Sequence, residues 1–471
     1  MKKTILDYLK ENHQYINASC NGNHQCGQCK VKLLNRKPDL SETEKKFLSH
    51  EEIDNSIILA CFHDYQKDDE ILVFDMKMDI LDTLDEKHIH SCFEGNGLIL
   101  DIGTTTIVMK WIGNKGECLK TDAFINPQVS FGGDVISRIN ESKKHFDALC
   151  YCLIHEIEQR IIKQEMIINQ MIVCGNTTMT HFFIKEKVET LGKAPFHVLK
   201  KEMQKISSYH IFKNINYEFP IITFPHISAF VGGDIVAGIY ASDLDQSLKK
   251  VLFVDLGTNG EMVLGNKEGF IVTSSAAGPA FEGVGISCGG SSINGAISHV
   301  SLQPFRLEVI GSSEAQCICG SGLISLFSEL VRNQKIDELG HIVDGDEIVL
   351  SKKVKLNSKD ISHFQLSKAA IETGIKILLE NNETDTLYIA GGFGTHLDIN
   401  DLKNIRVIPQ TIKNIKYLGN SAINGCYKLL MSQDFNRVNE IIEKSQSIDL
   451  SKHPDFEDTF IESMYFYDED Y

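Results

Sequence analysis

The stretch Gly97–Gly113, GLILDIGTTTIVMKWIG, has the pattern of two buried strands joined by a tight turn. An apolar run leads to Asp101, Gly103 and three threonines form the turn, and a second apolar run follows. In such a hairpin, backbone N–H groups and hydroxyls at the turn can hold phosphate, and the aspartate can hold Mg²⁺ through its water shell. One copy alone also fits an ordinary hairpin.

The pattern recurs at Val251–Gly265, VLFVDLGTNGEMVLG, and another glycine-rich turn follows a strand at Leu387–Leu397, LYIAGGFGTHL. Two copies predict two similar lobes that face one nucleotide, and the later turn leaves room for an adenosine. The candidate nucleotide contacts are Gly103, Thr104, Thr105, Asn176, Gly257, Thr258, Asn259, Gly260, Gly391, Gly392, Phe393 and Gly394. Asn176 is included because its sequence, CGNTTM, presents an amide and hydroxyls after a strand much as the phosphate turns do.

In this order, the three motifs resemble the two phosphate loops and the adenosine loop of the actin, sugar-kinase and heat-shock-chaperone ATPase superfamily. The resemblance implies an α/β fold with duplicated ribonuclease-H-like lobes. Two stretches rich in small residues, His226–Tyr240 and Gly419–Leu430, fit the helices that cross in this superfamily as the lobes close. In the first stretch we expect a helix with close contacts at Ala229, Gly232, Gly233 and Gly238.

Four carboxylates are the candidate catalytic residues. Asp101 and Asp255 end the first strand of each hairpin and are predicted to position Mg²⁺ and phosphate. Glu261 and Asp234 are candidates for orienting the attacking water, although a structural ion pair explains either residue equally well.

Three cysteines lie close together in CNGNHQCGQCK, Cys20–Lys30, and a fourth, Cys61, follows in IILACFHDY. Cys20, Cys26 and Cys29 are spaced C-x5-C-x2-C, one residue longer in the first gap than the plant-type ferredoxin spacing. A closely curled loop of this kind can wrap a 2Fe–2S cluster, because the cluster sulfides accept hydrogen bonds from backbone N–H groups. A four-cysteine zinc site and disulfides are the alternatives.

The segment around these cysteines resembles most of a small α+β ferredoxin-like domain of the β-grasp type. It differs from that family in two respects. A helix pattern, TILDYLKENH, begins almost at the N-terminus and leaves no room for the usual first hairpin, and Asn21 and His24 stand where glycine is usual.

Five further stretches resemble the reductive activators of corrinoid proteins. They are INPQVSFGGDVISRI (Ile125–Ile139), CGNTTMTHFF (Cys174–Phe183), AAGPAFEGVGISCG (Ala276–Gly289), CGSGLISLFSEL (Cys319–Leu330) and DFEDTFIESMYF (Asp455–Phe466). This resemblance implies that ATP hydrolysis, with Mg²⁺, drives one electron from the 2Fe–2S cluster to the inactive Co(II) corrinoid of a partner methyl-transfer protein and regenerates Co(I). It also implies an electron-donating reductase as a partner and a homodimer.

Two other functions are considered. In an activator of a 2-hydroxyacyl-CoA dehydratase-like iron–sulfur enzyme, Cys317 and Cys319 of CICGSG would help to hold a second cluster between subunits. Alternatively, the chain is a redox-sensing nucleotide-binding regulator or kinase that delivers no electron.

The bulk composition agrees with a multidomain globular protein: of 471 residues, 42% are hydrophobic and 24% charged. A net charge of −17 disfavours nucleic acid as a partner, and the N-terminus fits neither a signal peptide nor a membrane anchor. Thirteen cysteines without a secretory signal favour a cytoplasmic location and no membrane contact. The predicted organisation is a ferredoxin-like domain at 1–78, a linker at 79–96, and ATPase lobes at 97–240 and 241–471, the second ending in a return helix and an acidic tail.

Overall fold

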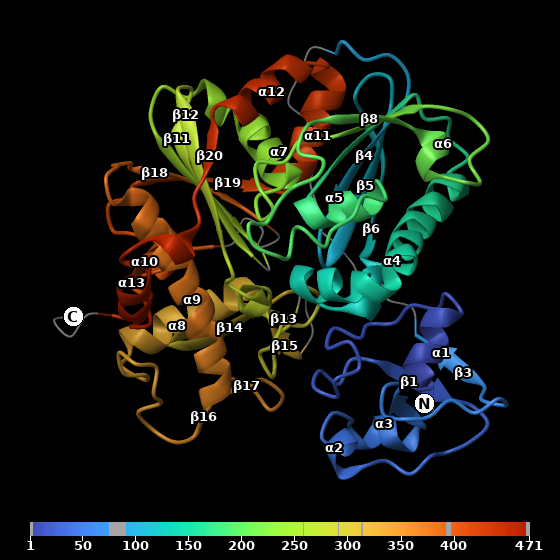
Figure 1. The fold of residues 1–471 in the computed structure, drawn as a ribbon. Coiled ribbons are helices and arrows are strands. Elements are labelled where there is room, and N and C mark those ends of the chain that lie inside the picture. The colour runs from blue at the N-terminus through green and yellow to red at the C-terminus, as the bar shows by residue number, and fades with distance from the viewer. Residues whose placement is uncertain are drawn as a thin grey trace. The chain divides into compact units, whose positions relative to one another are not determined.

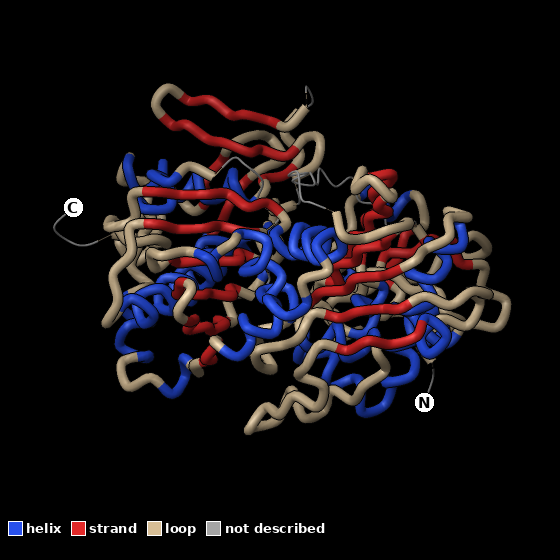
Figure 2. The backbone as a smooth tube through the Cα atoms, turned by 90° about the horizontal axis from the view of Figure 1, so that it is seen from above, coloured by secondary structure: helices blue, strands red, loops and turns tan. Residues whose placement is uncertain are grey.

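The computed structural model describes residues 3–74, 91–257, 259–290, 292–311, 314–391 and 397–467. The described residues up to Gly233, together with Leu429–Gln433, form one compact unit, and the remaining ones form a second unit. Figure 1 gives the labels of the helices and strands, and Figure 2 shows the strands as neighbouring bands within each unit. Most of the predicted linker lies outside the described residues. No helix in the described ranges is long and apolar enough to cross a bilayer.

The N-terminal head, residues 3–74, is a small α+β domain with a three-stranded antiparallel sheet in the order β2-β1-β3. Its elements are α1 (Ile5–Glu11), β1 (Lys30–Leu33), α2 (Glu42–Lys45), α3 (His50–Asp54), β2 (Ile57–Leu59) and β3 (Ile71–Val73). Helix α1 begins directly after Thr4, whose hydroxyl and the Asp7 carboxylate form a reciprocal capping box. The early helix predicted from the sequence is therefore present.

The first ATPase lobe contains a six-stranded sheet in the order β6-β5-β4-β7-β9-β8. Its strands are β4 (Gly97–Ile102), β5 (Thr106–Ile112), β6 (Cys118–Ile125), β7 (Gln170–Gly175), β8 (Gln204–Ser207) and β9 (Pro220–Thr223). Its helices are η1 (Pro127–Phe131), α4 (Val135–Lys163), α5 (Thr177–Phe183) and α6 (Ser208–Ile211). Strand β4 pairs antiparallel with β5 and parallel with β7.

The second lobe repeats this topology in a sheet with the order β19-β18-β10-β11-β12-β20. Its strands are β10 (Val251–Leu256), β11 (Gly260–Asn266), β12 (Gly269–Ser275), β18 (Thr386–Ala390), β19 (Asn414–Gly419) and β20 (Ser445–Ser447). Strand β10 pairs antiparallel with β11 and parallel with β18, as β4 does with β5 and β7. The duplicated α/β lobes predicted from the repeated hairpin are confirmed.

The other elements of the second unit are helices and short strands. The helices are α7 (Gly233–Ser242), η2 (Leu244–Gln246), η3 (Pro279–Glu282), α8 (Gly320–Arg332), α9 (Ser358–Leu379), α10 (Ile399–Asn404), α11 (Ser421–Ser432), α12 (Phe435–Glu443), η5 (Leu450–Lys452) and α13 (Phe456–Glu462). The short strands are β13 (Ala296–Leu302), β14 (Phe305–Val309), β15 (Cys317–Ile318), β16 (Glu347–Val349) and β17 (Lys355–Asn357).

The predicted helix over His226–Tyr240 begins later than expected, at Gly233. The preceding residues instead form a turn in which the N–H groups of Ile227 and Ser228 both donate to the Val231 carbonyl. This turn packs on the end of β7, where a Cβ atom at Gly232 would lie 2.5 Å from the Asn176 Cα atom. Residues 226–232 therefore form a turn and not the first part of the helix, because the turn allows this close backbone contact.

The predicted close crossing of two small-residue helices is confirmed for α7 and α11. A Cβ atom at Gly425 would lie 2.3 Å from the Ala237 carbonyl oxygen, and one at Gly238 would lie 2.8 Å from the Ser421 Oγ atom. Both contacts leave no room for a larger side chain on these faces.

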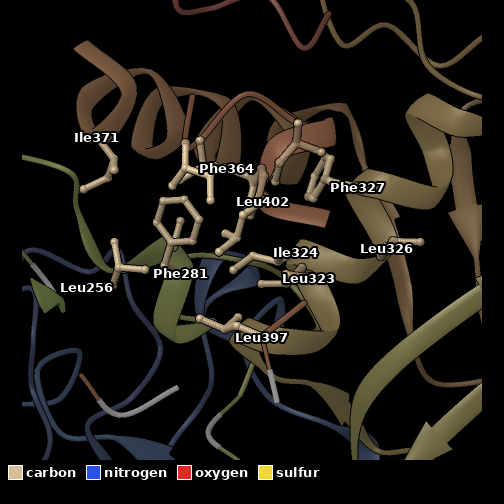
Figure 3. Close-up of a cluster of buried hydrophobic side chains, with 14 of the residues drawn as sticks. Leu256, Phe281, Leu323, Ile324, Leu326, Phe327, Phe364, Ile371, Leu397 and Leu402 are labelled. Carbon is tan, nitrogen blue, oxygen red and sulfur yellow. The ribbon is translucent and has the colours of Figure 1, made fainter. Parts of the chain in front are cut away.

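The core of the second unit is built around stacked phenylalanines (Figure 3). The rings of Phe327 and Phe364 stack with centroids 3.9 Å apart, and Phe281 packs against Phe364 at 5.1 Å. Phe466, near the C-terminus, stacks on Phe327 at 5.5 Å. The stretch Asp455–Phe466 therefore contributes a side chain to this core.

We predict that Phe327→Ala lowers the free energy of unfolding of the second unit by about 3–5 kcal/mol, since it leaves a cavity between the rings of Phe364 and Phe466. The matched control is Phe305→Ala, because Phe305 is 57% exposed and its loss is expected to cost less than about 0.5 kcal/mol. Urea unfolding of both variants, followed by circular dichroism, measures the difference. Equal losses in the two variants would contradict the assignment of this cluster as the core.

Candidate functional site

The register of the head's sheet brings two of the four predicted cluster cysteines together. Strands β1 and β2 pair Lys30 with Leu59, so the residues just outside these positions, Cys29 and Cys61, lie at the same end of the strand pair. Their Sγ atoms are 3.3 Å apart. The Sγ atoms of Cys20 and Cys26, in the preceding loop, are also 3.3 Å apart.

The loop directs backbone N–H groups at these sulfur atoms. Burial raises the pKa of Cys20, but backbone N–H groups, including those of Gln25 and Asn23, outweigh it and leave this pKa below its usual value. The pKa of Cys29 is lowered to about 7, chiefly by the hydrogen bond from the Cys61 thiol, while burial acts in the opposite direction. These effects favour the thiolate form of Cys20 and Cys29, which is the form that binds metal. The pKa values of their partners are raised, that of Cys26 mainly by burial and that of Cys61 mainly by the hydrogen bond with Cys29.

The two departures from glycine keep the backbone geometry that glycine normally provides. Asn21 and His24 both have positive φ angles, 50° and 59°, a region that asparagine and histidine adopt more readily than most residues. The Asn21 Oδ1 atom accepts a hydrogen bond from Lys10 Nζ at 2.7 Å. The His24 ring stacks on Phe62 with centroids 4.1 Å apart, and its Nε2 atom lies 2.9 Å from the Cys61 carbonyl oxygen.

The arrangement of the thiols distinguishes between the metal alternatives. They form two pairs, Cys20 with Cys26 and Cys29 with Cys61. A zinc site needs four ligands around one ion, whereas a 2Fe–2S cluster takes its four cysteines around two irons. The residues present therefore fit the cluster, and all thirteen cysteines are free thiols in the structure.

The first phosphate turn, Gly103–Thr105, is held by polar side chains of its own lobe. The Thr104 Oγ1 atom accepts a hydrogen bond from the Asn176 Nδ2 atom at 2.9 Å. The Gly103 carbonyl accepts a hydrogen bond from the Asn126 Nδ2 atom at 2.9 Å. Asp101, at the end of β4, is half-buried and lies beside Cys174 in the parallel neighbour. The structure thus brings together three of the predicted residues of this lobe: Asp101, Thr104 and Asn176.

The second phosphate turn follows β10 in the same way. The N–H group of Gly257 donates to the Asn259 carbonyl at 3.1 Å and closes the turn. A Cβ atom at Gly391 would lie 2.5 Å from the Leu256 carbonyl and 3.2 Å from Asp255 Oδ1, so the predicted adenosine turn begins beside this aspartate. Thr258, Gly392, Phe393 and Gly394 lie outside the described residues.

A glycine plays the same part in both lobes. Gly175 ends β7 with a φ of +152°, and Gly391 follows β18 with a φ of +112°. Added Cβ atoms at these positions would lie 2.6 Å from the Ile102 carbonyl and 2.5 Å from the Leu256 carbonyl, the residues next to Asp101 and Asp255. The two turns are therefore equivalent in three dimensions as well as in sequence.

Three carboxylates of the second unit interact: Asp255 on β10, Glu261 on β11 and Asp234 in the first turn of α7. Burial raises the pKa of Glu261 well above its usual value, and the charges of Asp234 and Asp255 raise it further. Burial also raises the pKa of Asp234 to about 6. This accumulation of negative charge is unfavourable without a cation and is typical of sites that bind a divalent ion.

Arg138 was missed by the sequence reasoning. Its side chain is fully buried, and its Nη2 atom donates to the Thr104 carbonyl at 2.6 Å, while its Nε atom donates to the Gly132 carbonyl at 2.9 Å. Burial lowers the pKa of Arg138 to about 10, so the guanidinium remains charged at neutral pH. The residue stands in the quoted stretch Ile125–Ile139, but nothing in that stretch alone indicates contact with a turn more than thirty residues earlier.

The cysteines considered for a second cluster are placed differently from the four in the head. Cys319 is 1% exposed and precedes helix α8, and its thiol contacts the Ile297 carbonyl and the Ser321 hydroxyl. Burial raises the pKa of Cys317. A buried thiol with partners in its own unit is poorly suited to bridge two subunits.

Comparison with known proteins agrees with a ferredoxin-like head followed by an ATPase domain. Family models match the chain over three ranges: the 2Fe–2S iron–sulfur cluster binding domain over residues 2–63, the RACo middle region over 96–247, and the C-terminal, ASKHA domain of RACo over 249–471. These matches confirm the ferredoxin-like head and the actin-like ATPase fold predicted from the sequence.

Individual relatives extend over most of the chain. The corrinoid activation enzyme RamQ of Eubacterium limosum is 31% identical over 421 residues, which are 79% of this chain and 70% of RamQ. The [Co(II) methylated amine-specific corrinoid protein] reductase of Methanosarcina barkeri is 25% identical over 399 residues, 75% of this chain and 72% of the reductase.

A solved structure, a reductive activator for corrinoid, iron–sulfur protein, superposes with a TM-score of 0.73 at 26% identity and covers 98% of this chain and 95% of its own. The head, both lobes and the C-terminal stretch are all included in this match. The chain belongs to the family of reductive activators of corrinoid proteins.

Proposed function

We propose that this chain is an ATP-dependent reductive activator, which transfers one electron from its 2Fe–2S cluster to the inactive Co(II) corrinoid of a partner methyl-transfer protein. The observation that carries the proposal is the presence, in one chain, of four paired thiols in a ferredoxin-like head and of two equivalent phosphate turns in an ATPase fold. The balance is one electron: the reduced cluster is oxidised by one electron and Co(II) becomes Co(I). The named activities of the two curated relatives support the choice of acceptor.

The need for ATP follows from the energetics of the electron transfer. Co(I) is a strong reductant, and a plant-type ferredoxin cluster has a potential near roughly −400 mV. Each 59 mV of shortfall in a one-electron step lowers the equilibrium constant about tenfold, which is about 1.4 kcal/mol. The ATPase supplies free energy that can offset such a deficit.

The four cysteines, Cys20, Cys26, Cys29 and Cys61, are the proposed cluster ligands. When bound, the cluster supplies a one-electron donor. The chain's own contribution is to hold the two thiol pairs and to direct backbone N–H groups at their sulfur atoms. Such hydrogen bonds stabilise negative charge on the ligands and help to set the potential.

The two phosphate turns are the proposed contacts for the ATP phosphates, with Asp101 and Asp255 as the ligands of Mg²⁺ through its water shell. Glu261 is the proposed residue that orients the attacking water. Its raised pKa supports this role, because a bound cation would favour the carboxylate form that can accept a proton. Asp234 is the second candidate, and Gly391–Gly394 are the proposed adenosine contacts.

The family resemblance also leads us to expect a cytoplasmic homodimer that receives its electron from a separate reductase. The net charge of −17 supports protein and small-molecule partners over nucleic acid.

Replacement of one cluster ligand separates the two activities. We predict that Cys26→Ser lowers the iron content and abolishes Co(I) formation, while the chain still binds ATP. The matched control is Cys92→Ser, since Cys92 is exposed and outside the cluster loop. Iron analysis, visible absorption and Co(I) spectra of the anaerobic proteins measure these effects. Unimpaired Co(I) formation by Cys26→Ser would refute the cluster as the electron donor.

The complementary variant is Glu261→Gln. It is expected to lower the rate of ATP hydrolysis by roughly 100-fold, as expected for the loss of a general base, with iron content unchanged. Glu268→Gln, at the exposed turn after β11, is the control and is expected to hydrolyse ATP normally. Hydrolysis is measured as phosphate release with and without a Co(II) corrinoid protein. A normal rate in Glu261→Gln would transfer the proposed role to Asp234, which Asp234→Asn then tests.

A further inference from the structure

A short segment of the first lobe, residues 127–133, contacts the ferredoxin-like head; we call it the docking loop. The fully buried Ser130 hydroxyl accepts a hydrogen bond from the Ile16 N–H group at 2.9 Å and donates to the Ile16 carbonyl at 2.5 Å. The Gly133 N–H group donates to the Ser19 carbonyl at 2.9 Å. Ser19 directly precedes Cys20, so the docking loop is bonded to the backbone that leads into the first cluster ligand.

The docking loop is also connected to the first phosphate turn. Arg138 donates to the Gly132 carbonyl of the docking loop and to the Thr104 carbonyl of the turn. Asn126, just before the docking loop, donates to Gly103 through its side chain and to Thr105 through its N–H group at 2.8 Å. The guanidinium is planar and fully buried, so a shift of one carbonyl is passed to the other more directly than through a flexible side chain.

A positive charge lies where the docking loop meets the cluster loop. The Lys10 Nζ atom donates to Asn21 in the cluster loop and lies 5.1 Å from the centroid of the Phe131 ring in the docking loop. It interacts electrostatically with Asp7 and Glu141 and, more weakly, with Cys29 and Cys20. Reduction adds one negative charge to a cluster, so the reduced form gains more than the oxidised form from a cation held here.

We infer that Arg138 is a positioning residue that couples the first phosphate turn to the cluster loop through the docking loop, so that nucleotide binding and the redox state of the cluster influence each other. The inference rests on the proposed function, because it assigns the coupling within that function to named residues. Phosphate bound at the turn displaces or fixes the Thr104 carbonyl, and Arg138 and the docking loop pass this change to Ile16, Ser19 and the surroundings of Lys10. Thermodynamic linkage makes this effect reciprocal. If bound nucleotide changes the equilibrium constant for reduction of the cluster by some factor, reduction of the cluster changes the affinity for nucleotide by the same factor.

The test measures the Kd of a non-hydrolysable ATP analogue, by anaerobic calorimetry, with the cluster oxidised and then reduced. For the wild-type chain we expect the two Kd values to differ by at least about fivefold, the lower end of usual coupling factors. In Ser130→Ala, which removes both bonds to Ile16 without touching the phosphate turn, the ratio is expected to fall below about twofold. Iron content and the Kd in the oxidised state should stay at wild-type values.

Ser142→Ala is the matched control. Ser142 is a buried serine of the same lobe, but its hydroxyl bonds to Ile139 within its own helix, α4. This variant is expected to keep the wild-type ratio. If Ser142→Ala loses the ratio as Ser130→Ala does, the effect is a general loss of packing and the inference is overturned.

Two further variants examine the ends of the connection. Arg138→Lys keeps the charge but cannot reach both carbonyls in the same fork, and is expected to lower the ratio as Ser130→Ala does. Lys10→Met keeps the contact with Phe131 and removes the charge. It is expected to shift the oxidised-to-reduced ratio of the cluster at a fixed potential severalfold toward the oxidised form, which an equilibrium dye titration records.

Failure of the inference and failure of the proposed function give different results. A wild-type chain that holds iron and binds the ATP analogue with equal Kd values in both redox states overturns the coupling. So does a wild-type ratio in Ser130→Ala. A chain that holds no cluster or binds no nucleotide instead overturns the proposed function.

Discussion

The central strand of each lobe, β4 in the first and β10 in the second, is hydrogen-bonded on both sides, to an antiparallel hairpin partner and to a parallel strand. This double pairing fixes the end of the strand, where Asp101 or Asp255 stands, against the end of the parallel neighbour. Only glycine fits there, because a Cβ atom at Gly175 or Gly391 would lie within 2.6 Å of a carbonyl oxygen. The position of the two aspartates and of the turns beside them depends on this constraint.

The two hairpins and the cysteine loop could be predicted because each depends on residues that are close together in the sequence. Apolar runs that end in aspartate and glycine mark both hairpins, and strands buried on both faces lack the alternation of surface strands. The cysteine spacing likewise singled out the four thiols that form two pairs in the head, and the register of β1 and β2 explains why Cys61, far along the chain, joins Cys29. The domain boundaries and the roles of the individual site residues stay predictions.

The features that could not be predicted depend on contacts between distant segments. Helix α7 begins at Gly233 because the preceding turn packs on the end of β7, and a run of small residues does not reveal which of them is helical. Asn21 and His24 stand where glycine is usual, yet both keep the positive φ of glycine and gain partners in Lys10 and Phe62. In the sequence, Arg138 cannot be told from any other polar residue of a helix. The fold places its guanidinium between two carbonyl groups.

The energetic problem of the reaction gives these features a common purpose. A ferredoxin-type cluster is a modest reductant, so the free energy of ATP must act on the electron transfer and not merely accompany it. A chain that carries the cluster and the ATPase can link the two only through contacts that both sites change. Buried hydrogen bonds between backbone groups and rigid side chains suit this task, because they are costly to leave unmade.

The central claim is that the cluster of this chain gives its electron to cobalt, and does so because ATP is present. The most direct measurement is a single turnover in which the chain, reduced in advance and freed of reductant, is mixed anaerobically with a Co(II) corrinoid protein. Electron paramagnetic resonance then follows the reduced cluster and the Co(II) signal together. The account predicts that both signals disappear one for one when ATP is added, and persist without it. Loss of the Co(II) signal while the cluster stays reduced, or at the same rate without ATP, would contradict it.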